Sequence, residues 1–494
     1  MNRHVFLLVG FVLSSGGCSL APDYVQPESP IPRSWSEGAE NSNVDTGADP
    51  MLAPDIQWKD FFPDPRMQEV IELALTNNRD LRVAALNIEK AQALYGIQRS
   101  QLMPSVGVAA VGDTTRIPEG MSLTGQAYTQ ETYTVGLGVA AWELDLFGRV
   151  RSLKEAALQQ FFATQYARSA AQISLVAAVA NSYLAIAADR ESLQLAQITL
   201  ETQKDSYELI RQSREFGVAS ELDLRQAQAQ VEVARVDVAA FTGRVAVDEN
   251  ALSLLIGVPL PDELLPDTLE SVRAPKDVSS GVSSEVLLQR PDILMAESRL
   301  KAMNANIGAA RAAFFPRISL TGSVGTISTD LSGLFGAGAG TWSFAPVITL
   351  PIFTGGANRA NLDAARVDHE IGVSQYEKAI QVAFREVKDS LALRTTLDDQ
   401  AAAQEALVDA VEASFRLYDA RYKAGIDAYL GVLVAQRSLY GAQQGLVNVR
   451  LALLANRVVL YKVLGGGDLM QAMKNQGDVQ LPGEAKKTRE EGRG

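Results

Sequence analysis

The chain has 494 residues, a net charge of −13 and 47% hydrophobic residues, enough apolar material for a large core. The acidic balance argues against a nucleic-acid partner, because phosphate binding needs clustered Lys and Arg. With one cysteine and two histidines, the chain has little material for a zinc site, a thiol enzyme or a Ser-His-Asp triad, so we expect no enzyme.

The first 17 residues have the layout of a secretory signal peptide. A short basic start is followed by the apolar run Val5 to Leu13 and then by small residues up to Gly17. The only cysteine, Cys18, comes next, and Ser15-Gly16-Gly17-Cys18 resembles a bacterial lipoprotein box, in which the cysteine carries a covalent lipid. We expect that lipid and no other cofactor. The alternative is an ordinary secreted protein with an incidental thiol.

Ser19, rather than aspartate, follows the cysteine, and the same resemblance then implies export to the outer membrane. Residues 18–65 are rich in Pro, Asp and Ser, which is typical of an irregular segment. We interpret them as a tether that anchors the chain to lipid without crossing the bilayer.

A helix at about 66–102 precedes two predicted strands, about 104–112 and 131–141. In the second strand Tyr133, Val135, Leu137 and Val139 alternate with small or polar residues, so it has two unlike faces. The connecting segment, about 113–130, is rich in Gly, Ser and Thr. This pattern is typical of a membrane β-barrel with a wet interior. Soluble hairpins packed on a core are the alternative.

The segment 148–216 contains no proline and is rich in alanine, which predicts one helix about 100 Å long at 1.5 Å per residue. A partner helix is expected at 219–256. Gly217 ends the long helix, because glycine readily takes the left-handed conformation of a helix C-cap. Rods of this length must pack side by side in a coiled-coil-like wall.

The second half of the chain repeats this order. Arg151 and Gly217 recur as Arg359 and Gly425, 208 residues later, while Gly96 matches Gly308 at a shift of 212. The expected elements are helices at 284–314, 355–424 and 427–464 and strands at 316–326 and 341–352.

The two halves together supply four predicted strands. Four strands cannot close a barrel, since about eight are needed, so several chains must share one barrel.

These observations divide the chain as follows: 1–17 signal peptide, 18–65 tether, 66–257 first repeat, 258–283 linker, 284–465 second repeat and 466–494 C-terminal tail.

Several segments closely resemble the TolC-like outer-membrane efflux channels, in particular their OprM/NodT lipoprotein branch. They are Arg290-Pro291-Asp292-Ile293, the run from Gly308 to Pro316, Trp142-Glu143-Leu144-Asp145 with Phe147-Gly148-Arg149, and the ending Val463-Leu464-Gly465-Gly466-Gly467. The resemblance implies a mainly α fold with a small β part. Three chains would share a 12-stranded transmembrane β-barrel, continued by a long periplasmic α-helical barrel.

The resemblance also implies two sites near the turns at Gly217 and Gly425. The turns would meet a periplasmic adaptor through Gly217, Val218, Ala219, Ser220, Gly425, Ile426 and Asp427. The periplasmic gate would use Asp223 and Tyr422, whose hydrogen bond would contribute about 1.5 to 3 kcal/mol per chain, with Asp419 as a further candidate. Where TolC has an arginine this chain has Asp427, and where it has constriction aspartates this chain has Gly431 and Val434.

The predicted function is the passive exit duct of a tripartite efflux system. Small molecules such as drugs, solvents or metal ions would come from an inner-membrane pump, of the resistance-nodulation-division type, through the adaptor to the outside. One alternative is the outer-membrane channel of type I protein secretion. Another is a periplasmic coiled-coil adaptor or structural lipoprotein, although an adaptor typically has one helical hairpin rather than two.

Overall fold

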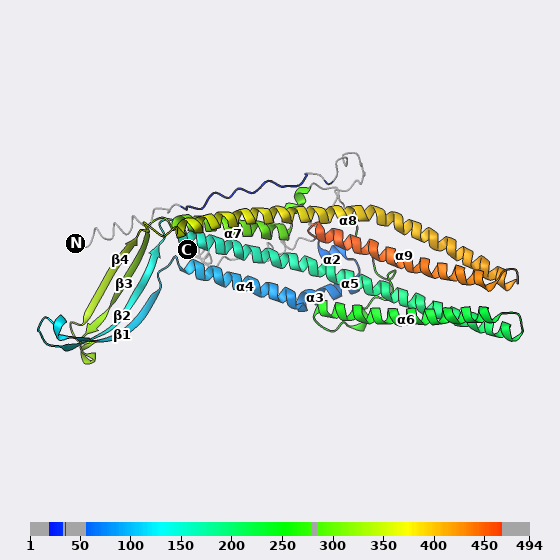
Figure 1. Cartoon of the computed structure of the whole chain (residues 1–494), viewed down its shortest axis with the longest axis horizontal. Helices are drawn as coiled ribbons and strands as arrows, with labels where there is room; N and C mark the ends of the chain where they lie inside the picture. The colour runs from blue at the N-terminus through cyan, green and yellow to red at the C-terminus, as the bar shows by residue number, and fades with distance from the viewer. Residues whose placement is uncertain (1–18, 33–34, 36–55, 279–283, 467–494) are drawn as a thin grey trace, which may run out of the picture.

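The structure is a computed structural model that describes residues 19–32, 35, 56–278 and 284–466. The molecule is elongated, with a β-sheet at one end and the turns of two helical hairpins at the other (Figure 1). The predicted lipid site at Cys18, the signal peptide and most of the C-terminal tail lie outside the described residues.

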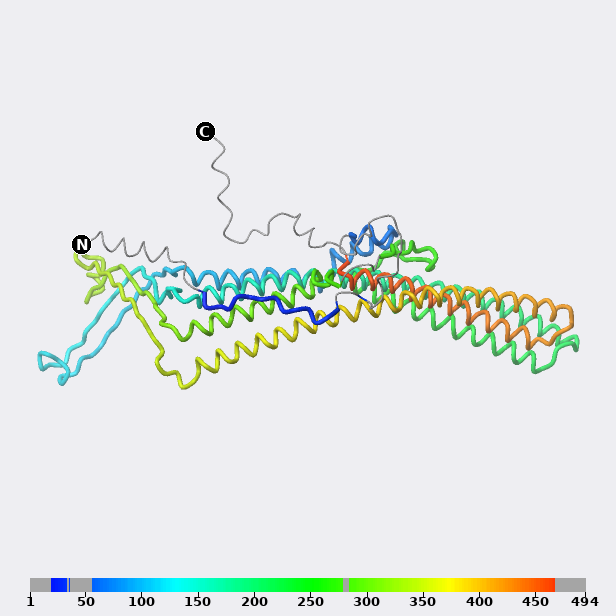
Figure 2. Tube along the Cα trace, turned by 90° about the horizontal axis from the view of Figure 1, so that it is seen from above, coloured from blue at the N-terminus to red at the C-terminus, as the bar shows by residue number. Residues whose placement is uncertain are grey.

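The longest predicted helices are confirmed to within two residues at each end. α5 (Arg149–Glu215) and α8 (Ala357–Lys423) each have 67 residues. α6 (Glu221–Ile256) and α9 (Tyr429–Val463) run back beside them, as Figure 2 shows.

The prediction of one helix at 66–102 was wrong, because α3 (Pro65–Asn77) and α4 (Arg79–Ser100) are separate. Asn78 leaves helical geometry and its side chain accepts from the amide of Leu81 at 2.8 Å, a strong N-cap. The helix predicted at 284–314 is also shorter. α7 (Pro291–Ala312) begins with Pro291 in its first turn, after a 3₁₀ turn at Ser284–Gln289.

Four antiparallel strands form one sheet in the order β1-β2-β3-β4: β1 (Val106–Ile117), β2 (Tyr128–Leu144), β3 (Arg317–Ser328) and β4 (Gly340–Thr349). The loop of the first hairpin is therefore shorter than the predicted 113–130, since the ladder continues to the pair Ile117 and Tyr128.

The register confirms the two unlike faces of the sheet. One row across all four strands joins Val108, Leu137, Val324 and Trp342. The next row, on the opposite face, joins Gly107, Gly138, Ser323 and Ser343. Successive residues of a strand point to opposite faces, so the first face is apolar and the second is small and polar.

A β-bulge in β2 preserves these faces. Between the pairs Val139 to Gly322 and Trp142 to Leu320, β2 has one residue more than β3, and Ala141 has a positive φ of 49°. Without the extra residue, Trp142 would turn to the polar face and Glu143 to the apolar one. The bulge therefore keeps the carboxylate of Glu143 on the polar face.

The main core lies at mid-length, where α2 (Trp58–Phe61) and α3 pack on α5 and the ends of α6 and α9. Tyr461 stacks on Phe61 at 3.9 Å and donates a hydrogen bond to the carbonyl of Ile56. By length and composition, α5 alone among the described helices could cross a membrane. However, 56% of its most apolar window is buried in the molecule, which is typical of a core helix.

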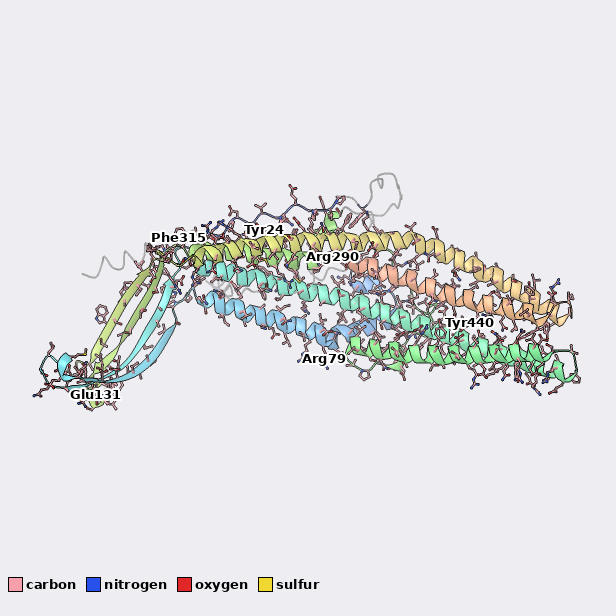
Figure 3. The ribbon with its side chains drawn as sticks, in the orientation of Figure 1. Tyr24, Arg79, Glu131, Arg290, Phe315 and Tyr440 are labelled. Carbon is pink, nitrogen blue, oxygen red and sulfur yellow. The ribbon has the colours of Figure 1, made fainter. Side chains whose placement is uncertain are left out.

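Arg290, the first residue of the Arg290-Pro291-Asp292-Ile293 segment, is buried in this core and connects three helices. Its guanidinium donates to Asp292, to Glu386 of α8 at 2.9 Å and to the carbonyl of Val463 at 2.7 Å. It therefore joins the start of α7 to α8 and to the end of α9. Figure 3 shows it at mid-length of the bundle.

Residues 19–32, here called the strap, lie extended and antiparallel to α7, with Tyr24 on its course (Figure 3). Arg311 donates to the carbonyl of Leu20 at 3.1 Å near the sheet, and Ser284 donates to the carbonyl of Pro32 at 2.6 Å near mid-length. Between these points a Cβ on Gly308 would lie 2.7 Å from the amide of Ala21. The strap can lie this close to α7 only because residue 308 is glycine.

Candidate functional site at the hairpin turns

The two predicted docking turns have the same backbone. In the first, the amide of Val218 donates to the carbonyl of Ser213 and that of Gly217 to Arg214, both at 2.9 Å. In the second, Ile426 donates to Arg421 and Gly425 to Tyr422, also at 2.9 Å. Gly217 and Gly425 have φ values of 75° and 73°. Both turns are therefore Schellman caps, as the glycines predicted.

The side chains that close the two turns differ. At the first turn Ser220 and Asp223 form a capping box: the Ser220 hydroxyl accepts from the Asp223 amide, and the carboxylate accepts from the Ser220 amide at 3.0 Å. At the second turn the guanidinium of Arg421 donates two hydrogen bonds, of 2.6 and 2.9 Å, to the carboxylate of Asp427. Arg421 also holds the pKa of Asp427 below its usual value. The aspartate that departs from the TolC pattern is thus paired inside its own chain.

Apolar side chains project into solvent around both turns. Phe216 and Val218 are 85% and 83% exposed at the first turn, and Ile426 is 65% exposed at the second. Leu222 and Leu430 occupy corresponding places after the turns and are also exposed. Exposed apolar groups of this density at the end of a helical rod are typical of a surface that binds another protein.

A small core joins the two hairpins just above their turns. Its buried members are Ile210, Leu224, Ala227, Tyr429, Val432 and Leu433, contributed by α5, α6 and α9. Tyr422, near the end of α8, packs against this cluster with its ring centroid 5.4 Å from that of Tyr429. The two turns of one chain therefore form one unit.

Of the predicted gate residues, Asp223 and Tyr422 lie near enough for the charge of the carboxylate to act on the phenol. Burial of the phenol, and secondly the charge of Asp223, raise the pKa of Tyr422. Asp223 accepts from both the amide and the hydroxyl of Ser220, the latter at 2.7 Å. In this arrangement the carboxylate caps α6, and its hydrogen bond to Tyr422 stays a prediction.

Asp419, the third gate candidate, accepts a hydrogen bond from Lys423 at 2.7 Å, one turn along α8. Its charge is thus paired with a cation of its own helix. Within the described ranges, no three His, Cys, Asp or Glu side chains group closely enough to hold a metal ion.

Gly431 and Val434, which replace the constriction aspartates, line a groove of about 840 Å³ between α8 and α9. A Cβ on Gly431 would lie 2.8 Å from the ring of Tyr418, so the missing side chain makes room for that ring. Arg421 and Asp427 close the end of the groove next to the turn. The sequence did not predict this groove; its one signal was glycine at a position where TolC has a carboxylate.

Comparisons with known proteins agree with this geometry. The family model described as outer membrane efflux protein matches residues 70–258 and 282–466. The probable efflux pump outer membrane protein TtgC of Pseudomonas putida is 46% identical over 98% of this chain and 100% of its own length. The solvent efflux pump outer membrane protein SrpC of the same species is 47% identical, with coverages of 92% and 97%. The structure of the open state of the Neisseria gonorrhoeae MtrE outer membrane channel aligns with a TM-score of 0.82 and 42% identity, covering 91% of this chain and 99% of that one.

Proposed function

The chain belongs to the outer membrane efflux protein family, and from this premise we propose how its copies, partners and cargo fit together. Its fold is that of the TolC-like channels, and it is an outer-membrane channel for efflux of small molecules. In our proposal three copies close one 12-stranded barrel, and their helices continue it as a tunnel into the periplasm. The chain itself does no covalent chemistry on what passes.

The observation that carries the proposal is the incomplete sheet. Among the strands of the described residues, β1 and β4 each have a single neighbour, so both edges of a sheet with an apolar outer face are unpaired in one chain. An open edge is not tolerated in lipid, because its amides and carbonyls would have no partner there. Pairing β4 of one copy with β1 of the next satisfies both edges and turns the polar face toward the inside.

The hairpin turns are the proposed contact with a periplasmic adaptor and, through it, with an inner-membrane pump of the resistance-nodulation-division type. This part is supported by the exposed Phe216, Val218 and Ile426 and by the adjacent groove at Gly431. The gate at Asp223, Tyr422 and Asp419 belongs to the same proposal, since these residues lie within a few helical turns of the docking surface.

A lipid on Cys18 would hold the chain at the inner surface of the outer membrane. The strap supports this role, because its first residues lie near the sheet end of α7, where Arg311 holds the carbonyl of Leu20. The cargo proposed for this chain is small organic molecules, including apolar solvents and antibiotics, as the names of its relatives suggest. Those names favour efflux over protein secretion.

Two measurements test the proposal. The protein purified in detergent should have the mass of three chains and open single channels in a planar bilayer. Deleting its gene should sensitise the bacterium to toluene and to hydrophobic antibiotics, and the intact gene should restore resistance. A monomer without conductance, or an unchanged susceptibility, would contradict it.

A further inference from the structure

At the junction of sheet and helices, two arginines share one carboxylate. Arg149, at the start of α5, donates to Glu143 through two hydrogen bonds of 2.8 and 2.7 Å. Arg317, at the start of β3, contacts the same carboxylate through Nε at 2.6 Å. Asp145, the other carboxylate in the wall of the larger cavity at this junction, is paired with Arg151 at 3.2 Å. Glu143 with its two arginines therefore leaves a net charge of +1.

Part of this positive charge is exposed to solvent, where it can attract an anion. The side chain of Glu143 is 10% exposed, whereas that of Arg317 is 61% exposed. Arg317 contacts Glu143 through Nε, and its guanidinium has further N–H groups on two terminal nitrogens that can donate to an anion.

Two cavities, of about 560 and 520 Å³, share Glu143, Arg149 and Arg317 in their walls. The larger one also has the rings of Phe147 and Phe315, which stack at 4.9 Å. Figure 3 places Phe315 at the meeting point of sheet and helices. A guanidinium beside aromatic rings suits an organic anion that has an apolar body.

The second repeat shows that the turn from strand to helix does not need these charges. The residues 208 positions after Glu143, Asp145 and Arg149 are Pro351, Phe353 and Ala357. Gly148 and Gly356 still have φ values of 76° and 91°, so both turns have the same left-handed residue before the helix. The turn from strand to helix therefore forms without the charged cluster, and the cluster is not needed for this backbone geometry.

We propose that Arg317, held with Arg149 by Glu143, forms a binding site for the anionic group of transported organic molecules at the inner mouth of the barrel. The inference rests on the proposed function, because only closure of the barrel turns the face that bears Glu143 and Arg317 inward. Three copies would then place a ring of three such sites around the passage. A positive ring in a narrow pore favours anions and lowers their free energy of entry.

The test measures block of single channels in a neutral phosphatidylcholine bilayer by benzoate and by benzamide, its neutral counterpart of similar shape. Benzoate should block the wild-type channel at far lower concentration than benzamide. Arg317→Gln should weaken the benzoate block about tenfold or more, the loss expected for one charge-assisted hydrogen bond, and Arg317→Lys should weaken it less. The matched control is Arg359→Gln, an 87% exposed arginine at the start of α8, which should leave the block unchanged.

Equal block by the two compounds, or equal effects of the two glutamine variants, would overturn the proposed site while the conductance itself upholds the channel function. Loss of the benzoate block in a bilayer of anionic phosphatidylglycerol would assign the arginines to a lipid headgroup and also overturn it. Absence of any wild-type conductance would remove the channel and the site together.

Discussion

At the scale of single residues, Gly217 and Gly425 determine the shape of the docking surface. Their positive φ values lie where an L-amino acid with a Cβ is strained. The sequence predicted both turns, since each glycine follows a long segment without proline.

We expect Gly217→Ala or Gly425→Ala to destabilise its turn by about 1 to 2 kcal/mol, the cost of the left-handed conformation for a residue with a Cβ. Hydrogen exchange of the turn amides should rise accordingly. The control is Gly243→Ala, an exposed glycine inside α6 with open space around it, which should stabilise its helix by about 0.5 to 1 kcal/mol. Equal exchange at the turns in all three variants would refute this account.

Tyr422→Phe should raise single-channel conductance. The variant keeps the ring that packs on Tyr429 but removes the hydroxyl that lies near Asp223. Tyr207→Phe, in another ring of the same cluster, should leave conductance at the wild-type value. If Tyr422→Phe has no effect, the gate lies elsewhere, and the ion pair of Arg421 with Asp427 becomes the next candidate.

At the scale of elements, Asp189 of α5 and Asp248 of α6 form an unfavourable contact between two helices. Burial, and secondly a hydrogen bond and charge from Asp248, raise the pKa of Asp189 to about 6, although Arg244 opposes this. The folded protein therefore holds a proton that the unfolded chain releases near pH 4. Stability should fall as the pH rises from about 4 to about 6 and stay lower above that range.

Asp189→Asn should remove this penalty. Its melting temperature should exceed that of the wild type at pH 7.5, and the difference should vanish at about pH 3, where the carboxyl is protonated in both the folded and the unfolded chain. Asp205→Asn, at an exposed position of the same helix, is the control for loss of one carboxylate charge, and at pH 7.5 it should raise the melting temperature less than Asp189→Asn does. A pH-independent effect of Asp189→Asn would rule out the proposed proton.

The strap and α7 are a second pair of elements whose contact depends on one residue. In Gly308→Ala the added methyl would lie 2.6 Å from the hydroxyl of Ser152 and 2.7 Å from the amide of Ala21, so the strap must move away. Hydrogen exchange of residues 19–26 should then increase. The counterpart of Gly308 in the first repeat is Gly96, where a Cβ would meet no atom within 4 Å. Gly96→Ala should leave the strap unchanged, and identical exchange in both variants would contradict the packing argument.

At the scale of the whole molecule, the sequence predicted what depends on local pattern. Alternation in β2 placed Val135, Leu137 and Val139 on one face, and the register agrees. What it missed depends on distant partners. The helix break at Asn78 is stabilised by a hydrogen bond to the carbonyl of Leu255, 177 residues away. The pairing of Glu143 with Arg317 could not be read from either segment alone, since it exists only when β2 lies beside β3.

The strap has a consequence for the order in which the polypeptide matures. Tyr24 bonds to Glu297, 273 residues later, and Gln26 to Tyr376, 350 residues later. These early residues leave the ribosome before their partners are synthesised. They can acquire their native contacts only after α7 and the first part of α8 are in place, so a docked strap marks a chain whose second repeat has begun to pack on the first.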